Sequence, residues 1–433
     1  MPNKQETLNL LQSPITRQLF AKMYDKQEVV ITAQIERYIK LIHGFIDNFQ
    51  DTDMELFSSP GRSEIGGNHT DHNYGKVLTA SINLDSIAAA ARTNDGNITV
   101  YSEGYPEPFI ISLNELDKKQ DEGGTTALIR GIAAGFVKFG YEVGGFQANM
   151  SSSVINASGL SSSASVEMLI CTILNTFYNQ GKLDTVIQAR IGQFAENAYW
   201  DKPSGLLDQM ACGHGGLVSI DFRDPKNPLI ESIGFDFSKQ DHSLIIVNTG
   251  TNHADLTDEY AAVPNEMTSV AKALGGRVCR DISLDQVLDN MIELREKLSD
   301  RALLRAMHFF AENQRVEEQA EALKNDNFPQ FLKLITESGN SSWKLLQNCY
   351  IGTIPSEQGV CITLGITEAF LKQKRAGACR VHGGGFAGGI LVFLPNQDIP
   401  DYLYLMEKAL GPNSIYVISI REYGSVHING LLS

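Results

Sequence analysis

The chain has 433 residues and a formal net charge of −15, so repulsion argues against a nucleic-acid partner. Its 42% hydrophobic and 20% charged residues are ordinary for a globular protein, and its length predicts two domains. No apolar run approaches the ~18 residues of a membrane span or forms a signal-peptide core, so we expect a cytoplasmic protein with no membrane partner.

The first half of the chain alternates between helical and strand-like patterns. Apolar residues recur at helical intervals within residues 1–50. Residues 54–60 are typical of a short strand leading into Pro-Gly, and residues 76–113 alternate as strands do. A helix is predicted over residues 125–140, and a strand over 146–155.

The second half is more helical. After a helix ending near residue 180, we expect a helix over 184–200, strands at 215–222 and 243–248, and mostly helices over 256–347. The six cysteines are far apart and include no C-x-x-C pair, which predicts free thiols. The predicted division is a helical extension (1–35), an N-terminal domain (36–215) and a C-terminal domain (216–433).

A glycine-punctuated segment, residues 59–73, concentrates Arg, Asn, His and Asp side chains, which predicts a polar, hydrogen-bonding loop. Paired donors and acceptors of this kind suit a polyhydroxylated ligand. His69 and Asp71 lie two residues apart, so their side chains would share a face of an extended chain. A solvated loop with a satisfied histidine is the alternative.

The run Gly-Leu-Ser-Ser-Ser-Ala at residues 159–164 lies between a predicted strand and a predicted helix. The free N–H groups and the dipole at a helix start bind phosphate, and glycine lets the backbone approach closely. An ordinary serine N-cap is the alternative. Downstream, Glu196 and Asp208 offer carboxylates, and a carboxylate with a serine hydroxyl is a familiar Mg²⁺ pairing. A solvated surface charge is the alternative for each of them.

The glycine run at residues 383–389 matches G-x-G-x-x-G literally. The dinucleotide-binding motif needs a helix after the glycines, whereas residues 390–394 are strand-like, so we reject that interpretation. A loop of this kind between two strands lets backbone come close to a ligand or to another loop. P-loop and protein-kinase motifs are absent from the sequence.

Together the three motifs resemble those of the GHMP small-molecule kinase superfamily and, within it, the galactokinase family. The family motif P-G-R-V-N-L-I-G-E-H-T-D-Y is matched by PGRSEIGGNHTDH, the motif G-L-S-S-S-A is intact, and the glycine loop reads GGGFAGG. The similarity runs from about residue 40 to the C-terminus. It implies an α+β fold with two domains, an N-terminal mixed-sheet domain and a C-terminal α+β domain, with the active site in the cleft between them.

The resemblance implies transfer of the γ-phosphoryl group of ATP to the anomeric hydroxyl of galactose, with Mg²⁺, in a monomer or weak oligomer. It makes Asp208 and Arg62 the catalytic pair, and whether Asp208 acts as a base or only stabilises and orients the alcohol is left open. It makes Ser163 and Glu196 the Mg²⁺ ligands. The other implied positions are Asn68, His69, Asp71, Gly205 and Tyr260 for the sugar, Ser158, Gly159, Leu160, Ser161, Ser162 and Ser163 for ATP, and Gly383, Gly384 and Gly385 for the glycine loop.

The first motif departs from the family where Asn68 replaces a glutamate that contacts the C6 side of the sugar, and Ser63 and Glu64 replace Val and Asn. Asparagine lacks the charge that would repel a C6 carboxylate, so galacturonate is one alternative substrate and N-acetylgalactosamine another. A non-catalytic galactose sensor and a kinase for a mevalonate-type or homoserine-type alcohol are the remaining alternatives.

Overall fold

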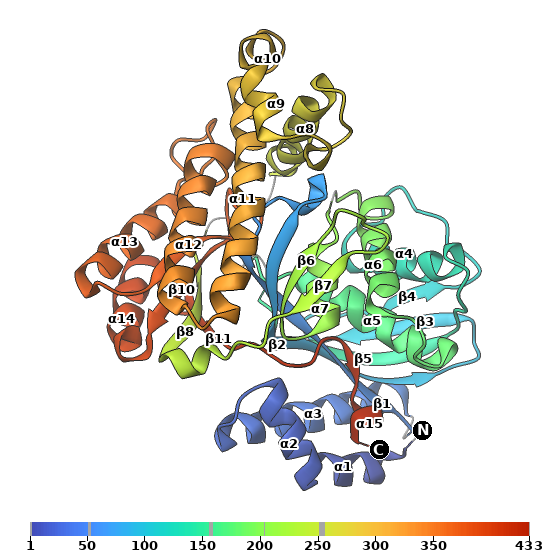
Figure 1. The fold of residues 1–433 in the computed structure, drawn as a ribbon. Helices are drawn as coiled ribbons and strands as arrows, with labels where there is room; N and C mark the ends of the chain where they lie inside the picture. Colours follow the sequence, from blue (N-terminus) through green and yellow to red (C-terminus); the bar gives the residue numbers. More distant parts are fainter. Residues whose placement is uncertain (1, 51–52, 156–158, 203, 251–255, 433) are drawn as a thin grey trace.

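The computed structural model describes residues 2–50, 53–155, 159–202, 204–250 and 256–432. Its strands form two sheets, one of eight strands and one of four, with helices packed on both (Figure 1). Among the described helices, none has the length and hydrophobicity that a membrane span requires.

The large sheet has the strand order β12-β1-β2-β5-β3-β4, with β6 paired to β2 and β7 paired to β6. Its pairings are antiparallel except for the parallel pair of β3 and β5, so the sheet is mixed. Its strands are β1 (Glu55–Gly66), β2 (Lys76–Arg92), β3 (Asn97–Ser102), β4 (Phe109–Ser112), β5 (Phe146–Ser152), β6 (Leu217–Asp221), β7 (Leu229–Ser232) and β12 (Val426–His427).

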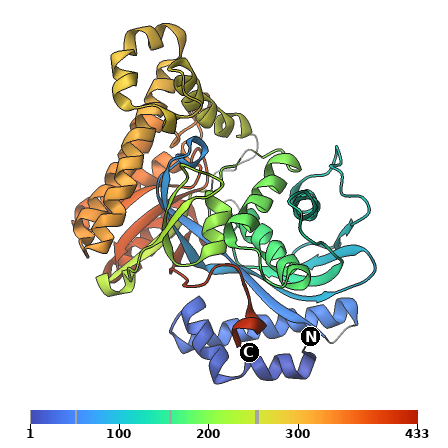
Figure 2. The ribbon, with the colours of Figure 1, turned by 45° about the vertical axis from the view of Figure 1, so that its right-hand side comes forward.

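Helices cover both faces of this sheet. Successive side chains of a strand point to opposite faces, and the central strands carry apolar side chains on each face. Phe57 and Ala88 pack toward one set of helices, whereas Leu56 and Ala89 pack toward the N-terminal helices. Figures 1 and 2 show the N-terminal helices beneath the sheet, close to the C-terminus. The first set is α4 (Gly124–Lys138), α5 (Ser162–Asn179), α6 (Thr185–Ala198) and α7 (Leu207–His214), and the second is α1 (Lys4–Leu11), α2 (Pro14–Met23) and α3 (Glu28–Phe49), with α15 (Ile428–Leu432).

The small sheet is antiparallel, with the order β11-β8-β10-β9. One face shares a hydrophobic cluster with β1 and β2 of the large sheet, where Leu244 and Leu391 join Ile65 and Leu78. This shared core joins the two halves of the molecule. The elements are β8 (His242–Asn248), β9 (Ala378–His382), β10 (Gly389–Pro395) and β11 (Ile415–Ile418), with α12 (Phe328–Ser341), α13 (Gly359–Lys374) and α14 (Ile399–Leu410) packed around them.

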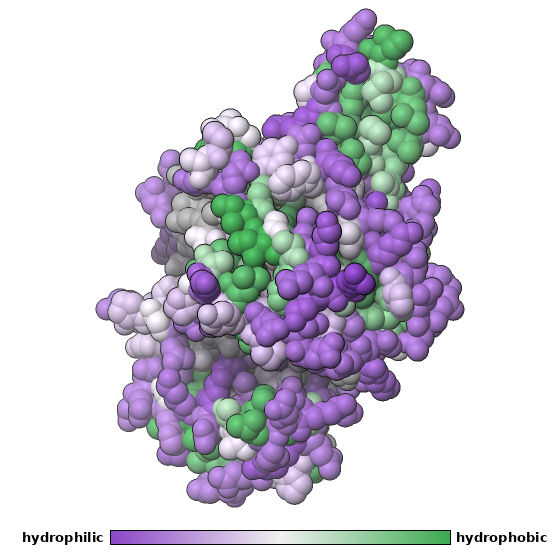
Figure 3. Space-filling model, turned by 90° about the vertical axis from the view of Figure 1, so that its left-hand side faces the viewer, coloured by the Kyte–Doolittle hydropathy of each residue, from purple (hydrophilic) through white to green (hydrophobic). Residues whose placement is uncertain are grey.

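A helical arm extends from this half at the top of Figure 1. Its tip exposes Leu288 and Ile292, and Figure 3 shows apolar side chains at this end of the molecule. The arm consists of α8 (Thr257–Ala273), α9 (Leu284–Asp289), α10 (Met291–Lys297) and the long α11 (Asp300–Lys324). The short helical turns of the chain are η1 (Asp71–Asn73), η2 (Phe237–Gln240), η3 (Cys279–Asp281), η4 (Ser342–Leu346) and η5 (Asn396–Asp398).

The structure corrects one predicted element. The strand expected at 54–60 continues to Gly66, so half of the segment predicted to be a loop is buried strand. The predicted boundary after residue 35 falls inside α3, and β6 and β7, which follow the boundary after residue 215, belong to the large sheet. The division into domains stays a prediction.

All six cysteines are free, as expected.

Candidate active site

An ion pair between Arg62 and Asp208 lies where three elements meet. Arg62 is in β1, Asp208 is in the first turn of α7, and Ser161 directly precedes α5. The guanidinium Nε and Nη2 atoms of Arg62 each lie 2.8 Å from Oδ1 of Asp208, and the Ser161 hydroxyl donates to Oδ2 at 2.5 Å. The predicted catalytic pair and the serine turn are therefore in direct contact.

The surroundings of Asp208 keep its carboxylate ionised. Burial by itself raises the pKa of Asp208, but the charge and hydrogen bond of Arg62, the Ser161 hydrogen bond and the Lys202 charge together lower that pKa to about 2. The N-terminal end of α7 adds partial positive charge. About 27% of the side chain is exposed, so this anion is accessible to a ligand.

The serine turn is open at the start of α5 rather than capped by its own serine. Ser161 precedes the helix with φ of 57° and makes no side-chain capping hydrogen bond, because its hydroxyl bonds Asp208 instead. The ordinary N-cap interpretation is therefore wrong, and the first N–H groups of α5 lack that partner. Gly159, with φ of 76°, lies so close to His382 that a Cβ would be 3.0 Å from its Nδ1 atom. Ser158 lies outside the described residues.

Leu160 and Gly159 join the serine turn to β1. The N–H of Arg62 donates to the carbonyl oxygen of Leu160 at 3.1 Å, and the Arg62 guanidinium donates to the carbonyl oxygen of Gly159. Leu160 is fully buried. These contacts fix the serine turn against the strand that carries the arginine.

The two predicted metal ligands also meet. The Ser163 hydroxyl donates to Oε1 of Glu196 at 2.9 Å, and Gln209 holds Oε2 of Glu196 at 3.0 Å. The Lys202 ammonium lies 2.6 Å from the same Oε1 and 3.2 Å from the Ser163 oxygen. The positive charge of Lys202 thus already lies next to these two oxygens. This arrangement is compatible with a bound cation at the same place. The described residues contain no group of three or more His, Cys, Asp or Glu side chains that could hold a metal, so water and phosphate oxygens would complete the shell.

His69 presents a neutral ring with one unused nitrogen. Its Nε2 lies 2.8 Å from the carbonyl oxygen of Gly384, which requires the proton on Nε2. Burial and the charge of His72 lower the pKa of His69 to about 3. The Nδ1 atom is buried and has no hydrogen-bond partner among the described residues. A neutral histidine in this tautomer accepts a hydrogen bond through Nδ1, for example from a sugar hydroxyl.

Asp71 contacts the loop that leads into α7. Its Oδ2 accepts from the N–H of Leu207 at 3.4 Å, and a Cβ at Gly205 would lie 1.8 Å from that oxygen. Only glycine therefore fits at position 205 with Asp71 in place. The expected reason for pairing His69 with Asp71 was wrong, because His69 has φ of 57° and Asp71 begins a helical turn, so the chain is not extended there.

The glycine loop joins β9 to β10, as the sequence predicted, and meets the first motif. The Gly383 carbonyl accepts from the Asn68 amide at 2.7 Å, and the Gly385 carbonyl accepts from the Tyr260 hydroxyl at 2.9 Å. A Cβ on Gly384 would lie 2.4 Å from the Tyr260 ring. The loop therefore brings backbone of the small-sheet half against Asn68, His69 and Tyr260.

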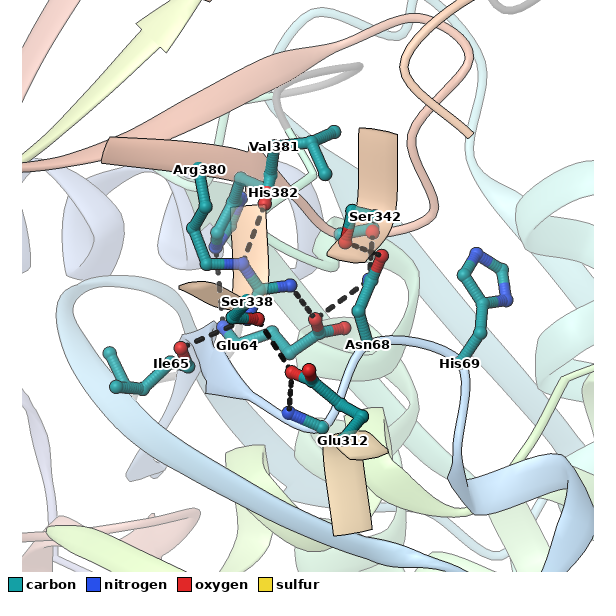
Figure 4. A network of polar contacts seen from close by, with 12 residues as sticks. Glu64, Ile65, Asn68, His69, Glu312, Ser338, Ser342, Arg380, Val381 and His382 are labelled. Atoms are coloured by element: carbon teal, nitrogen blue, oxygen red, sulfur yellow. Dashed lines mark hydrogen bonds and ion pairs between the residues drawn. The ribbon is translucent and has the colours of Figure 1, made fainter. Parts of the chain in front are cut away.

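Asn68 is completely buried, and all of its side-chain hydrogen-bonding positions are used. Figure 4 shows its contacts with Glu64 and Ser342. Its Nδ2 donates to Gly383 and to Glu64, while its Oδ1 accepts from Asn348 at 2.8 Å and from Ser342 at 3.4 Å. It lies with the sugar residues but has no free group to offer a substrate.

Sequence reasoning missed several residues of this site. Glu64 had a usable signal, because it lies two positions after Arg62 and thus on the same face of a strand. Lys202, Gln209 and Arg380, which donates to Oε1 of Glu64 at 2.8 Å, had none, because their place depends on how the chain folds around the site.

Two sequence models match the chain. Residues 43–92 match a galactokinase galactose-binding signature, and residues 127–216 match the GHMP kinases N terminal domain. The chain is 30% identical over 400 residues to a galactokinase of Lactococcus lactis subsp. lactis, covering 88% of this chain and 94% of the relative. It is also 30% identical over 388 residues to a galactokinase of Clostridium perfringens, covering 87% and 96%.

Solved structures agree with this similarity. A crystal structure of Lactococcus lactis galactokinase complexed with galactose superposes with a TM-score of 0.75 at 25% identity, covering 89% of this chain and 98% of the other. Methanococcus jannaschii mevalonate kinase gives a TM-score of 0.59 at 17% identity, covering 85% and 98%, which shows a shared fold. The predicted α+β fold with a mixed sheet is confirmed.

Proposed function

The chain belongs to the galactokinase family of the GHMP kinases, and we propose that it transfers the γ-phosphoryl group of ATP to the anomeric hydroxyl of galactose. The products are galactose 1-phosphate and ADP. The observation that carries this proposal is the contact of the Asp208 carboxylate with both Arg62 and the serine turn. The Asp208 carboxylate thereby lies between the serine turn, which can bind phosphate, and Asp71, one of the residues suited to a sugar.

In this proposal Asp208 orients the sugar hydroxyl that attacks the phosphorus. A carboxyl group with a pKa of about 2 is ionised at neutral pH and accepts a hydrogen bond well, but it is a weak base. Phosphoryl transfer depends mainly on positioning and charge stabilisation, and the alcohol need not lose its proton early. The low pKa therefore favours the orienting and stabilising role over early proton removal.

The start of α5 holds the phosphates of ATP. Residues 159–163 supply backbone N–H groups and hydroxyls at a helix N-terminus, where the dipole favours an anion. Arg62 keeps the developing charge near Asp208 balanced. A net charge of −15 on the whole chain makes such local donors necessary.

Ser163 and Glu196 would hold Mg²⁺ in this proposal, which the cation-accepting arrangement around Lys202 supports. Bound Mg²⁺ neutralises phosphate charge during transfer. Gln209 keeps Glu196 oriented through its second oxygen. Lys202 is then free to neutralise phosphate charge from the edge of the site.

Galactose rather than galacturonate is the proposed substrate. The case for galacturonate assumed that Asn68 leaves the sugar site without a carboxylate. A carboxylate oxygen of Glu64 lies 2.8 Å from the Asn68 amide, so the negative charge is retained one contact away. That charge disfavours a substrate that carries a second carboxylate. A cytoplasmic monomer or weak oligomer remains the prediction for location and assembly.

A substrate screen tests the proposal. Hexoses, N-acetylgalactosamine and galacturonate are incubated with ATP and Mg²⁺, ADP release is measured, and the phosphorylated position is read by NMR. We expect galactose to give the highest kcat/KM with phosphate on the anomeric oxygen, and Asp208→Asn to lower kcat by about 10²- to 10³-fold through loss of its orienting charge.

Two results of the screen would contradict the proposal. Galactose binding without any galactose-dependent ADP release would make the chain a sensor. Preferred phosphorylation of a different alcohol would reassign the substrate.

A further inference from the structure

Glu64 is a buried acidic residue that the roles above do not bring into direct contact with the sugar. It lies in β1 two positions after Arg62, and the pairing with β2 is regular between them, so both side chains leave the same face of the strand. Its side chain is 7% exposed. Burial raises the pKa of Glu64 above its usual value, and the charges of Arg380 and Arg62 offset only part of that rise.

One oxygen of Glu64 is held from two sides (Figure 4). Its Oε1 accepts from Nη2 of Arg380 at 2.8 Å and from Nδ2 of Asn68 at 2.8 Å. Arg380 is itself fully buried and also donates to the carbonyl oxygen of Ile65 at 3.0 Å. The carboxylate is thus fixed in place through a single oxygen.

The other oxygen, Oε2, makes no hydrogen bond within the described part of the chain. It is also not among the fully buried polar atoms that lack a partner, so this oxygen keeps some exposed surface. Arg62 and Asp71, which belong to the candidate site, both act electrostatically on this carboxylate. A carboxylate oxygen fixed in this way accepts a strong hydrogen bond from a hydroxyl group.

Asn68 cannot take that role without breaking contacts. Its two N–H groups and its oxygen are engaged with Glu64, Gly383, Asn348 and Ser342. The family motif has Asn where this chain has Glu64, and Glu where this chain has Asn68. The acid and the amide have therefore exchanged places, and in this chain they remain in contact.

We propose that Glu64 is a specificity-determining residue that accepts a hydrogen bond from a hydroxyl group of the sugar through Oε2. Asn68 and Arg380 are positioning residues that hold this carboxylate. The inference rests on the proposed function and names a residue that determines which sugar this chain binds.

Equilibrium binding of galactose without ATP, measured by calorimetry, tests the role of Glu64. Glu64→Gln removes the charge but keeps the shape, and we expect the Kd for galactose to rise about tenfold to a hundredfold. Repeating the measurement with each monodeoxygalactose identifies the hydroxyl. For the analogue that lacks it, wild type and Glu64→Gln should bind within about threefold of each other. Glu293→Gln, an exposed carboxylate on the helical arm, is the matched control.

A reciprocal exchange tests the positioning role independently of catalysis. Asn68→Glu places a second carboxylate against Oε1 of Glu64, so we expect a lower Tm and weaker galactose binding. The double variant Glu64→Asn with Asn68→Glu restores one acid and one amide. We expect it to bind galactose more tightly than Asn68→Glu alone and to regain Tm, which additive effects would not produce.

The outcomes separate this inference from the proposed function. Unchanged galactose affinity in Glu64→Gln, or an equal loss for every deoxy analogue, overturns the role of Glu64 while wild-type activity on galactose stands. A double variant no better than the sum of its single changes overturns the coupling with Asn68. Wild type that neither binds nor phosphorylates galactose overturns the proposed function itself.

Discussion

His69 shows how burial sets the chemistry of a single residue. The ring lies between the first motif and the glycine loop, and burial together with the nearby His72 keeps it neutral. A neutral ring offers an acceptor to a hydroxyl group, whereas a protonated ring would offer two donors. The local charge at the sugar site therefore depends on desolvation.

The same property predicts a pH dependence of stability. His69 has a folded pKa of about 3, against about 6.5 when unfolded. The unfolded chain therefore binds this proton first, and stability falls as the pH drops from about 6.5 toward 3. In urea titrations, His69→Gln should lower the slope of unfolding free energy against pH by up to about 1.4 kcal/mol per unit between pH 6 and pH 4. The exposed His43→Gln is the control, and an unchanged slope in His69→Gln would contradict the assignment.

Glu196 is the residue on which the metal prediction depends. Glu196→Gln keeps the hydrogen-bonding shape but removes the anionic ligand, so we expect the Mg²⁺ concentration for half-maximal ADP release to rise tenfold or more. Mn²⁺ binding measured by EPR on the enzyme with ADP should weaken in parallel, with galactose affinity retained. Equal metal requirements in both proteins would exclude Glu196 as a ligand.

At the scale of elements, two short turns place the catalytic groups. The turn before α5 directs Ser161 away from its own helix and toward Asp208, and the turn before α7 brings Gly205 against Asp71. Each turn leaves a helix N-terminus facing the same ion pair. The hydrophobic core sets the positions of the two helices. The turns before them determine which side chains and backbone N–H groups face the site.

Gly205→Ala tests the turn before α7. Its Cβ would lie 1.8 Å from Oδ2 of Asp71, so either the turn or Asp71 must move. We expect a KM for galactose at least tenfold higher and a loss of unfolding free energy of about 1–3 kcal/mol. Gly365→Ala is the control, because that glycine lies within α13 with open space around it, and the change should stabilise slightly. Wild-type KM in Gly205→Ala would show that this turn does not position the sugar site.

At the scale of the whole molecule, the site depends on two halves that share one core. The large-sheet half supplies Arg62, Asp208 and the serine turn, and the small-sheet half supplies the glycine loop and Arg380. The hydrophobic cluster that joins β1 and β2 to the small sheet keeps these groups together. Substitutions in that cluster should therefore affect both sugar and phosphate binding.

A buried charge cluster attaches the N-terminal helices to this body. Asp85 of β2 bonds Arg37 of α3 at 2.5 Å, the Tyr24 hydroxyl at 2.6 Å and Arg421 at 2.9 Å, and its side chain is fully buried. Asp85→Ala leaves two arginines without their shared anion, so we expect a loss of about 3–5 kcal/mol of unfolding free energy. Lys40→Ala, which breaks an exposed pair with Glu103, should cost less than about 1 kcal/mol. Both losses are measured by urea unfolding. A loss of unfolding free energy below about 1 kcal/mol in Asp85→Ala would contradict the anchoring role.

The sequence by itself determined the family, the order of the motifs and most helices, because these depend on local patterns such as the serine run at 159–164 and the apolar spacing of α5. Tertiary structure alone decided that Lys202 lies between Ser163 and Glu196, and that Glu64 contacts Asn68 and Arg380. The physical reason is that Glu64 with Arg380 and Ser163 with Lys202 are far apart in the chain, so their distances follow from how distant segments pack. Glu64 and Asn68 are only four residues apart, and they meet because the chain turns where β1 ends. Local periodicity carries no information about that packing. The sequence therefore predicted a loop at residues 59–66, whereas pairing with β2 makes this segment a buried strand.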